Sequence, residues 1–88
     1  MAEDRDLFRS IVDLTLDQAA YEGDGAWIDF RQLYSVFNSR QGKRLVRQLE
    51  QDTRLQAEIL AAAERANQAL HRAIDTAVHD IVRRYQPR

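Results

Sequence analysis

The chain has no cysteine, one proline and three glycines among its 88 residues. Without cysteine it can form neither disulfide bonds nor thiolate metal sites. No apolar run is long enough to span a membrane, and the charged first residues lack the apolar stretch of a secretory signal. We therefore expect a cytoplasmic protein without a membrane partner. Its 44% hydrophobic content is typical of a folded chain, and its length predicts a single domain over residues 1–88.

The net charge of −1 conceals a strong separation of charge along the chain. Residues 1–30 carry eight acids and two arginines, a balance of −6, whereas residues 31–47 carry five cations and no acid. Residues 48–88 carry six residues of each sign and cancel. Lys43 is the only lysine, so the other cations are arginines, whose planar fork can bond two acceptors at once. This pattern suits either a solvated, self-complementary surface or an anion-binding one.

Apolar residues recur every three or four positions along most of the chain, which predicts an all-α fold. A first helix is expected over residues 4–21 and a short second helix over residues 30–37. Gly23 and Gly25 favour a turn after the first helix. Asp29 has the right position to cap the second helix.

The longest predicted element is one amphipathic helix over residues 39–85, capped by Asn38 or Ser39 and followed by a short tail over residues 86–88. At about 1.5 Å per residue this helix would be roughly 65–70 Å long. The alternative is a break at Asp52-Thr53, where a capping-box spacing begins, with helices over residues 40–51 and 54–85. We favour the continuous helix because the apolar residues keep the same phase across this point.

Residues 1–38 are too few to cover so long a helix, so the predicted fold is hairpin-like and packs in an oligomer. An alanine border on the apolar stripe would allow a neighbouring helix to approach closely. Trp27, in a glycine-bearing loop, is the aromatic residue best suited to anchor a partner. The predicted interface with a second copy or another protein consists of Ile59, Ala63, Ala66, Leu70, Ala73, Ile74, Ala77, Ile81 and Trp27.

Four cations are expected on one side of the start of the third helix, near the free N–H groups of its N-terminus: Arg40, Lys43, Arg44 and Arg47. Nucleic-acid phosphate is one candidate ligand. Carboxylates from the acidic first 30 residues, of the same chain or a neighbouring copy, are the other. No DNA- or RNA-reading motif accompanies the patch, so a nucleic-acid contact would be independent of sequence. We expect protein carboxylates, because self-neutralisation needs no external ligand.

Metal sites are not expected. Residues 24–30 superficially resemble a calcium-binding loop, but neither possible register supplies the final bidentate glutamate. His71, Asp75 and His79 are spaced four residues apart, which separates the two histidines by about 12 Å along a helix. They cannot all bind one ion, so we interpret them as a solvated face. Glu50 and Arg54 have the spacing of a similar surface pair.

Nucleophilic catalysis finds no support either. Cysteine is absent, neither histidine is held near a serine by sequence, and there is no glycine-rich phosphate loop. The sequence therefore predicts a protein that is not an enzyme and that uses no cofactor or small molecule.

Eight residues between positions 33 and 49 form one pattern: an aromatic-rich short helix, a serine cap, a glycine in the next turn and then paired aliphatic residues. They are Leu33, Tyr34, Phe37, Ser39, Gly42, Leu45, Val46 and Leu49. The pattern resembles that of a family of short, poorly characterised tailed-bacteriophage proteins. The resemblance implies a phage origin and a role as a virion component, and it supplies no catalytic residues. The basic residues and the alanine-rich second half depart from the family's pattern.

These observations together predict a non-enzymatic helical assembly protein, a small structural component of a phage virion. It would form a homo-oligomer or bind another phage structural protein. It would be made in the cytoplasm and incorporated into the particle. The alternative is a regulatory module that binds nucleic acid or a host factor through the basic patch over residues 40–47.

Overall fold

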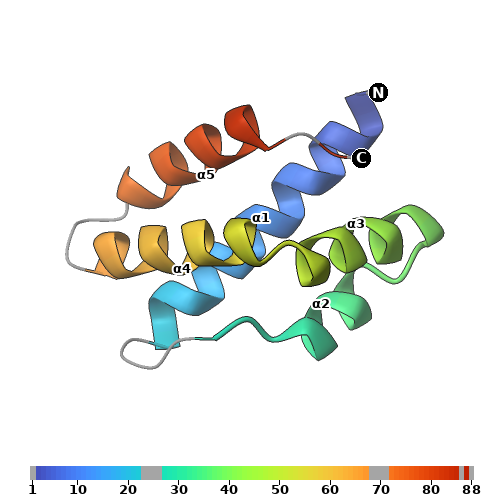
Figure 1. Ribbon diagram of the computed structural model, residues 1–88, viewed down its shortest axis with the longest axis horizontal. Coiled ribbons are helices and arrows are strands. Elements are labelled where there is room, and N and C mark those ends of the chain that lie inside the picture. The colour runs from blue at the N-terminus through green and yellow to red at the C-terminus, as the bar shows by residue number, and fades with distance from the viewer. Residues whose placement is uncertain (1, 23–26, 68–71, 86, 88) are drawn as a thin grey trace.

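Five α-helices and no strands make up the part of the chain that the structure, a computed structural model, describes (Figure 1). The described residues are 2–22, 27–67, 72–85 and 87, and side chains are described for residues 4–20, 27–65, 76–85 and 87. The all-α prediction is thus confirmed. The helices are α1 (Ala2–Glu22), α2 (Phe30–Val36), α3 (Arg40–Gln51), α4 (Thr53–Asn67) and α5 (Arg72–Arg84).

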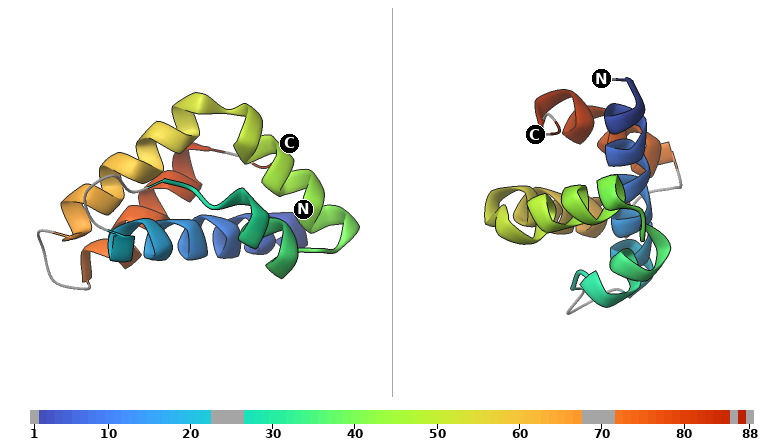
Figure 2. Two further views of the ribbon diagram at one scale, coloured as in Figure 1. Left: turned by 90° about the horizontal axis from the view of Figure 1, so that it is seen from below. Right: turned by 90° about the vertical axis from the view of Figure 1, so that its right-hand side faces the viewer.

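Helix α1 is the element around which the others are arranged, since it contacts α3, α4 and α5. Helices α3 and α4 meet at an angle and form an arch over α1, while α5 returns along α4 (Figures 1 and 2). The short helix α2 packs against α3. The molecule measures 35 × 24 × 20 Å, with a radius of gyration of 12.0 Å. No helix in the described ranges is long and apolar enough to cross a membrane.

The prediction of one continuous helix over residues 39–85 is wrong. Helix α3 ends at Gln51, and α4 begins at Thr53 after a non-helical Asp52 with φ −107° and ψ 89°. A helix of roughly 65–70 Å could not fit a molecule whose longest dimension is 35 Å. The break falls at the position of the alternative prediction, but a second interruption follows it. Helix α4 ends at Asn67 and α5 begins at Arg72, with residues 68–71 outside the described part.

Hydrogen bonds at the first break explain why the helix stops there. The backbone N–H of Leu55 donates to Asp52 Oδ1 at 3.0 Å, so Asp52 caps α4. The side-chain amide of Gln56 then donates to the carbonyl oxygens of Leu49 and Glu50, both at 2.9 Å. Gln56 thereby gives a donor to the Glu50 carbonyl at the end of α3 and a second donor to the Leu49 carbonyl, which also accepts the N–H of Asp52 at 3.2 Å.

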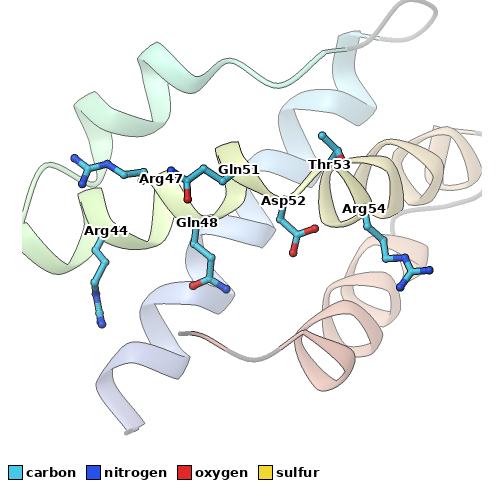
Figure 3. A pocket seen from close by; sticks show the side chains of 7 residues that line it. All are labelled: Arg44, Arg47, Gln48, Gln51, Asp52, Thr53 and Arg54. Atoms are coloured by element: carbon cyan, nitrogen blue, oxygen red, sulfur yellow. The ribbon is translucent and has the colours of Figure 1, made fainter.

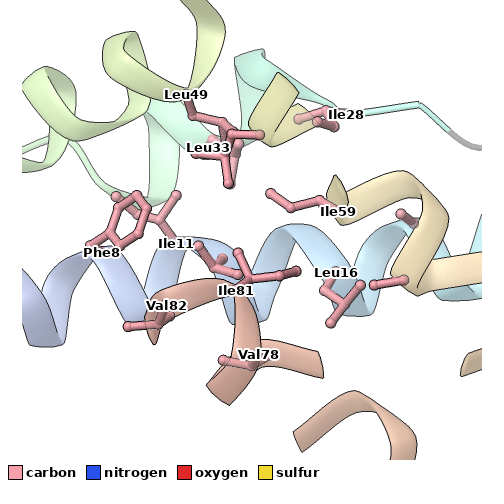
Figure 4. Packing of buried hydrophobic residues seen from close by; sticks show 14 of the residues in the cluster. Phe8, Ile11, Leu16, Ile28, Leu33, Leu49, Ile59, Val78, Ile81 and Val82 are labelled. Carbon is pink, nitrogen blue, oxygen red and sulfur yellow. The ribbon is translucent and has the colours of Figure 1, made fainter. Parts of the chain in front are cut away.

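The hydrophobic core lies between α1 and the four other helices (Figure 4). Thr15 is the one buried polar residue among the described side chains, and its hydroxyl donates to the carbonyl oxygen of Ile11 at 2.6 Å. The remaining buried side chains are apolar: Phe8, Ile11, Val12, Leu16, Ala19, Ile28, Leu33, Leu45, Val46, Leu49, Leu55, Ile59, Ala62, Ala63, Val78, Ile81 and Val82.

The apolar stripe that was expected to require a second chain is partly covered within the chain itself. Ile59, Ala63 and Ile81 are 0%, 2% and 1% exposed, because α4 and α5 pack on each other and on α1. Ala77 is partly buried against the same core. Four further members of the predicted interface lie outside the residues whose side chains are described: Ala66, Leu70, Ala73 and Ile74. Oligomer formation through this stripe stays a prediction. The long helix that was the reason for it is not present in the described part of the chain.

Candidate anion-binding surface

Helix α3 separates its apolar and charged residues onto opposite sides. Its buried residues are Gly42, Leu45, Val46 and Leu49. At 100° per residue, the four cations lie within an arc of about 100° on the other side. All four are exposed, and we term them the basic surface: Arg40, Lys43, Arg44 and Arg47. The structure thus brings together all four cations singled out from the sequence.

The start of α3 is fixed by a side-chain cap. Ser39 Oγ accepts a hydrogen bond from the backbone N–H of Gly42 at 3.0 Å, and the Ser39 carbonyl accepts one from Lys43 at 2.9 Å. Ser39, rather than Asn38, is therefore the cap of the third predicted helix. Because the Ser39 hydroxyl takes the Gly42 N–H, an anion on this surface would be bound mainly by side chains rather than by the helix end.

One member of the basic surface already binds a carboxylate of the chain. Arg44 Nη2 lies 2.6 Å from Asp4 Oδ2, and the two side chains are 49% and 23% exposed. This ion pair links the acidic start of α1 to the basic start of α3. Exposed pairs of this kind contribute at most about 1 kcal/mol to stability. The contact is nonetheless specific: it joins the two segments of opposite charge in the sequence.

Arg47 belongs to a second polar cluster, at the contact of α2 with α3. The hydroxyl of Tyr34 donates to Glu50 Oε1 at 2.7 Å. Burial raises the pKa of Tyr34 above its usual 10.0, and the hydrogen bond and negative charge of Glu50 raise it further, while Arg47 opposes them. Glu50 therefore accepts from α2, whereas its sequence spacing suggested a pair with Arg54.

Two adjacent hollows run along the charged side of α3. The first, of about 520 Å³, is lined by Arg40, Gln41, Lys43, Arg44 and Arg47. The second, of about 480 Å³, lies at the break between α3 and α4 and is lined by Arg44, Arg47, Gln48, Gln51, Asp52, Thr53 and Arg54 (Figure 3). The two hollows are neighbours, since Arg44 and Arg47 line both of them. We term the second one the α3–α4 hollow.

Arg54 is the member of this site that the sequence analysis missed. From its spacing, Arg54 was expected only to pair with Glu50, four residues before it. Helical spacing from Arg47 gives no signal for this site, because the non-helical Asp52 lies between Arg47 and Arg54.

The other candidates are placed as follows. Trp27 is 61% exposed and, with Val36 at 54%, is a large apolar side chain left at the surface. Asp29 caps α2, as predicted, by accepting from the N–H of Gln32 at 3.1 Å. His79 is exposed, while His71 and Asp75 lie outside the residues whose side chains are described. Across the described ranges, no three His, Cys, Asp or Glu residues are grouped closely enough to hold a metal ion.

The chemistry that this surface offers is hydrogen bonding and charge. Its guanidinium, ammonium, amide and hydroxyl groups are all donors, and guanidinium groups bind carboxylates and phosphates with two parallel hydrogen bonds. Comparisons of the chain with protein-family models, with curated proteins and with solved structures return no match.

Proposed function

We propose that this chain is a non-enzymatic assembly protein that holds an acidic partner protein through the basic surface of α3. The observation that carries the proposal is the bond between Arg44 and Asp4, at 2.6 Å. Within the chain, the basic surface already accepts a carboxylate. The exposed positions of Arg40, Lys43 and Arg47 leave room for further carboxylates from another molecule.

Several features favour protein carboxylates over nucleic-acid phosphates. No aromatic side chain lines either hollow in the described part of the chain, so bases would have nothing to stack on. The sequence pI is about 6.1, whereas nucleic-acid-binding domains are commonly strongly basic. Arg44 already bonds a carboxylate, that of Asp4, at 2.6 Å, which supports this type of ligand.

The charge pattern of the chain indicates that a second copy of it is one suitable partner. Asp6 and Asp13 are exposed on α1, so a second copy could present acids to the basic surface. Another structural protein with an acidic face is equally suited. The resemblance of residues 33–49 to short tailed-phage proteins supports a virion as the setting. Trp27, exposed beside α2, is proposed as an apolar anchor of such an assembly.

A labelled acidic peptide tests the proposal directly. Binding of fluorescein-labelled deca-glutamate in 50 mM NaCl would be followed by fluorescence anisotropy. We expect Arg40→Gln/Lys43→Gln to weaken binding several-fold, since two charge-assisted contacts are lost. Arg65→Gln/Arg83→Gln removes the same charge from exposed positions on α4 and α5 and serves as the matched control. Equal effects of the two double variants would contradict the proposal. Tighter binding of a random 20-base-pair DNA duplex, falling steeply with salt, would instead favour the nucleic-acid alternative.

A further inference from the structure

The α3–α4 hollow combines donors from two helices. Six of the seven lining side chains can donate hydrogen bonds, and three of these are arginines. Figure 3 shows Arg44, Gln48 and Asp52, spaced four residues apart, extending to the same side, with Arg54 beyond them. The first hollow, by contrast, lies entirely on α3. The break at Asp52 therefore adds a part of the surface that α3 alone does not provide.

The one acid in the α3–α4 hollow, Asp52, extends to the same side as Arg44 and Gln48, but one of its carboxylate oxygens is bonded to the backbone of α4. Asp52 Oδ1 accepts the N–H of Leu55 at 3.0 Å, as the cap of α4. A carboxylate at a helix N-terminus is stabilised by the positive end of the helix dipole. Asp52 is thus held by the backbone of α4, and it competes less for the surrounding guanidinium groups than a freely rotating acid would.

The two sides of the hollow are held at a fixed spacing. The Gln56 amide bonds the carbonyl oxygens of Leu49 and Glu50 at 2.9 Å and ties α4 to the end of α3. Leu49 and Leu55, on either side of the break, are fully buried. A site whose donors are positioned before binding loses less conformational entropy when a ligand binds.

We propose that the α3–α4 hollow binds carboxylate side chains from an acidic segment of the partner protein, and that Arg54 extends the basic surface onto α4. The inference rests on the proposed function and specifies its ligand. The two neighbouring hollows lie along the 12 residues of α3, about 18 Å at 1.5 Å per residue, and the second reaches Arg54 on α4. A ligand of matching length carries several acids in succession rather than one isolated charge.

The test compares two exposed arginines of the same helix. Arg54→Gln and Arg65→Gln remove the same charge from α4, but only Arg54 lines the hollow. Binding of labelled deca-glutamate in 50 mM NaCl is the readout, and unchanged circular dichroism confirms that each variant is folded. We expect Arg54→Gln to weaken binding about three- to tenfold and Arg65→Gln less than twofold. Arg54→Lys keeps the charge without the planar fork and should recover only part of the affinity.

The outcomes separate the inference from the proposed function. Suppose that Arg54→Gln and Arg65→Gln bind deca-glutamate with equal affinity while Arg40→Gln/Lys43→Gln still weakens binding. The proposed function of the basic surface is then supported, and the hollow is not a carboxylate site. If Arg40→Gln/Lys43→Gln also binds normally, both proposals fail. Tighter binding of a labelled 20-nucleotide thymidine oligomer than of deca-glutamate, lost in Arg54→Gln, would assign the hollow to phosphate and overturn the inference.

Discussion

Gly42 lies against the backbone of Phe37 so closely that a Cβ on Gly42 would stand 2.6 Å from the Phe37 carbonyl oxygen. It would also stand 3.0 Å from the carbonyl carbon and the Cβ of Phe37. Backbone atoms cannot rotate aside as a flexible side chain could. The absence of a side chain at Gly42 therefore allows the first turn of α3 to approach the end of α2 and sets the path of the chain into the basic surface.

An added methyl group at Gly42 would meet backbone atoms, so Gly42→Ala should cost about 2–3 kcal/mol, the upper part of the usual range for extra atoms in a packed site. The higher helix propensity of alanine offsets about 1 kcal/mol of this cost, so we expect a net destabilisation of about 1–2 kcal/mol. Urea unfolding followed by circular dichroism measures the difference. Gln41→Ala, on the exposed side of the same turn, should change the free energy of unfolding by less than about 0.5 kcal/mol. A Gly42→Ala variant as stable as the parent would contradict the close contact.

Asp52→Ala should lower the free energy of unfolding by about 1 kcal/mol, because it removes the cap that accepts the Leu55 N–H. The neighbouring Thr53→Ala is the informative comparison, since the alternative prediction of a break rested on a capping box beginning at Thr53. In the structure Thr53 is exposed and already within α4. Urea unfolding of both variants measures their free energies of unfolding. A larger decrease for Thr53→Ala than for Asp52→Ala would show that Thr53, and not Asp52, caps α4.

The stabilising contribution of Tyr34 should be lost at alkaline pH. Its folded-state pKa lies above the usual 10.0, so the folded chain holds the phenolic proton more tightly than the unfolded chain does. The resulting contribution is complete below about pH 10 and is lost as the pH rises through the folded-state pKa. Urea unfolding between pH 8 and pH 11 would measure it. Tyr34→Phe is the control, and its free energy of unfolding should fall less over this interval, because it lacks the phenolic proton that the folded chain holds. Parallel pH profiles would refute the prediction.

Self-assembly through opposite charges should depend on salt. Light scattering in 50 and 500 mM NaCl would report the mass of the purified protein. We expect an assembly in low salt that dissociates in high salt, since screening weakens contacts between exposed charges. Asp6→Asn/Asp13→Asn removes exposed acids of α1 and should shift the mass toward the monomer. A monomer at both salt concentrations would leave a different acidic protein as the proposed partner. An assembly unaffected by salt would point to the apolar stripe.

The spacing of apolar residues predicted the all-α fold. The main error of that prediction, one continuous helix over residues 39–85, has a physical cause. Periodicity identifies which side of a helix is buried but not whether the helix is continuous. Leu49 on α3 and Ile59 on α4 keep the same phase because both point into one core. Neither interruption is marked by glycine or proline in the sequence. The first break is stabilised by backbone bonds of Asp52 and Gln56, and the capping-box spacing at this point indicated it only as the alternative, because the apolar phase was given more weight.

The candidate site, like the fold, was predictable from the sequence only in part. The grouping of Arg40, Lys43, Arg44 and Arg47 follows from local helical spacing, so the sequence was sufficient to find it. The bond from Arg44 to Asp4 joins residues 40 positions apart, and it exists only because α3 packs on α1. No pattern within one helix could have indicated it.

The exposure of Trp27 determines what its fluorescence can report. The chain has one tryptophan, and its side chain is 61% accessible to solvent. Its indole is already largely hydrated in the native protein, so unfolding should change its emission wavelength only slightly. A blue shift, or protection from acrylamide quenching, would therefore indicate that another molecule has covered this loop. Trp27 fluorescence should therefore report association with another molecule rather than folding.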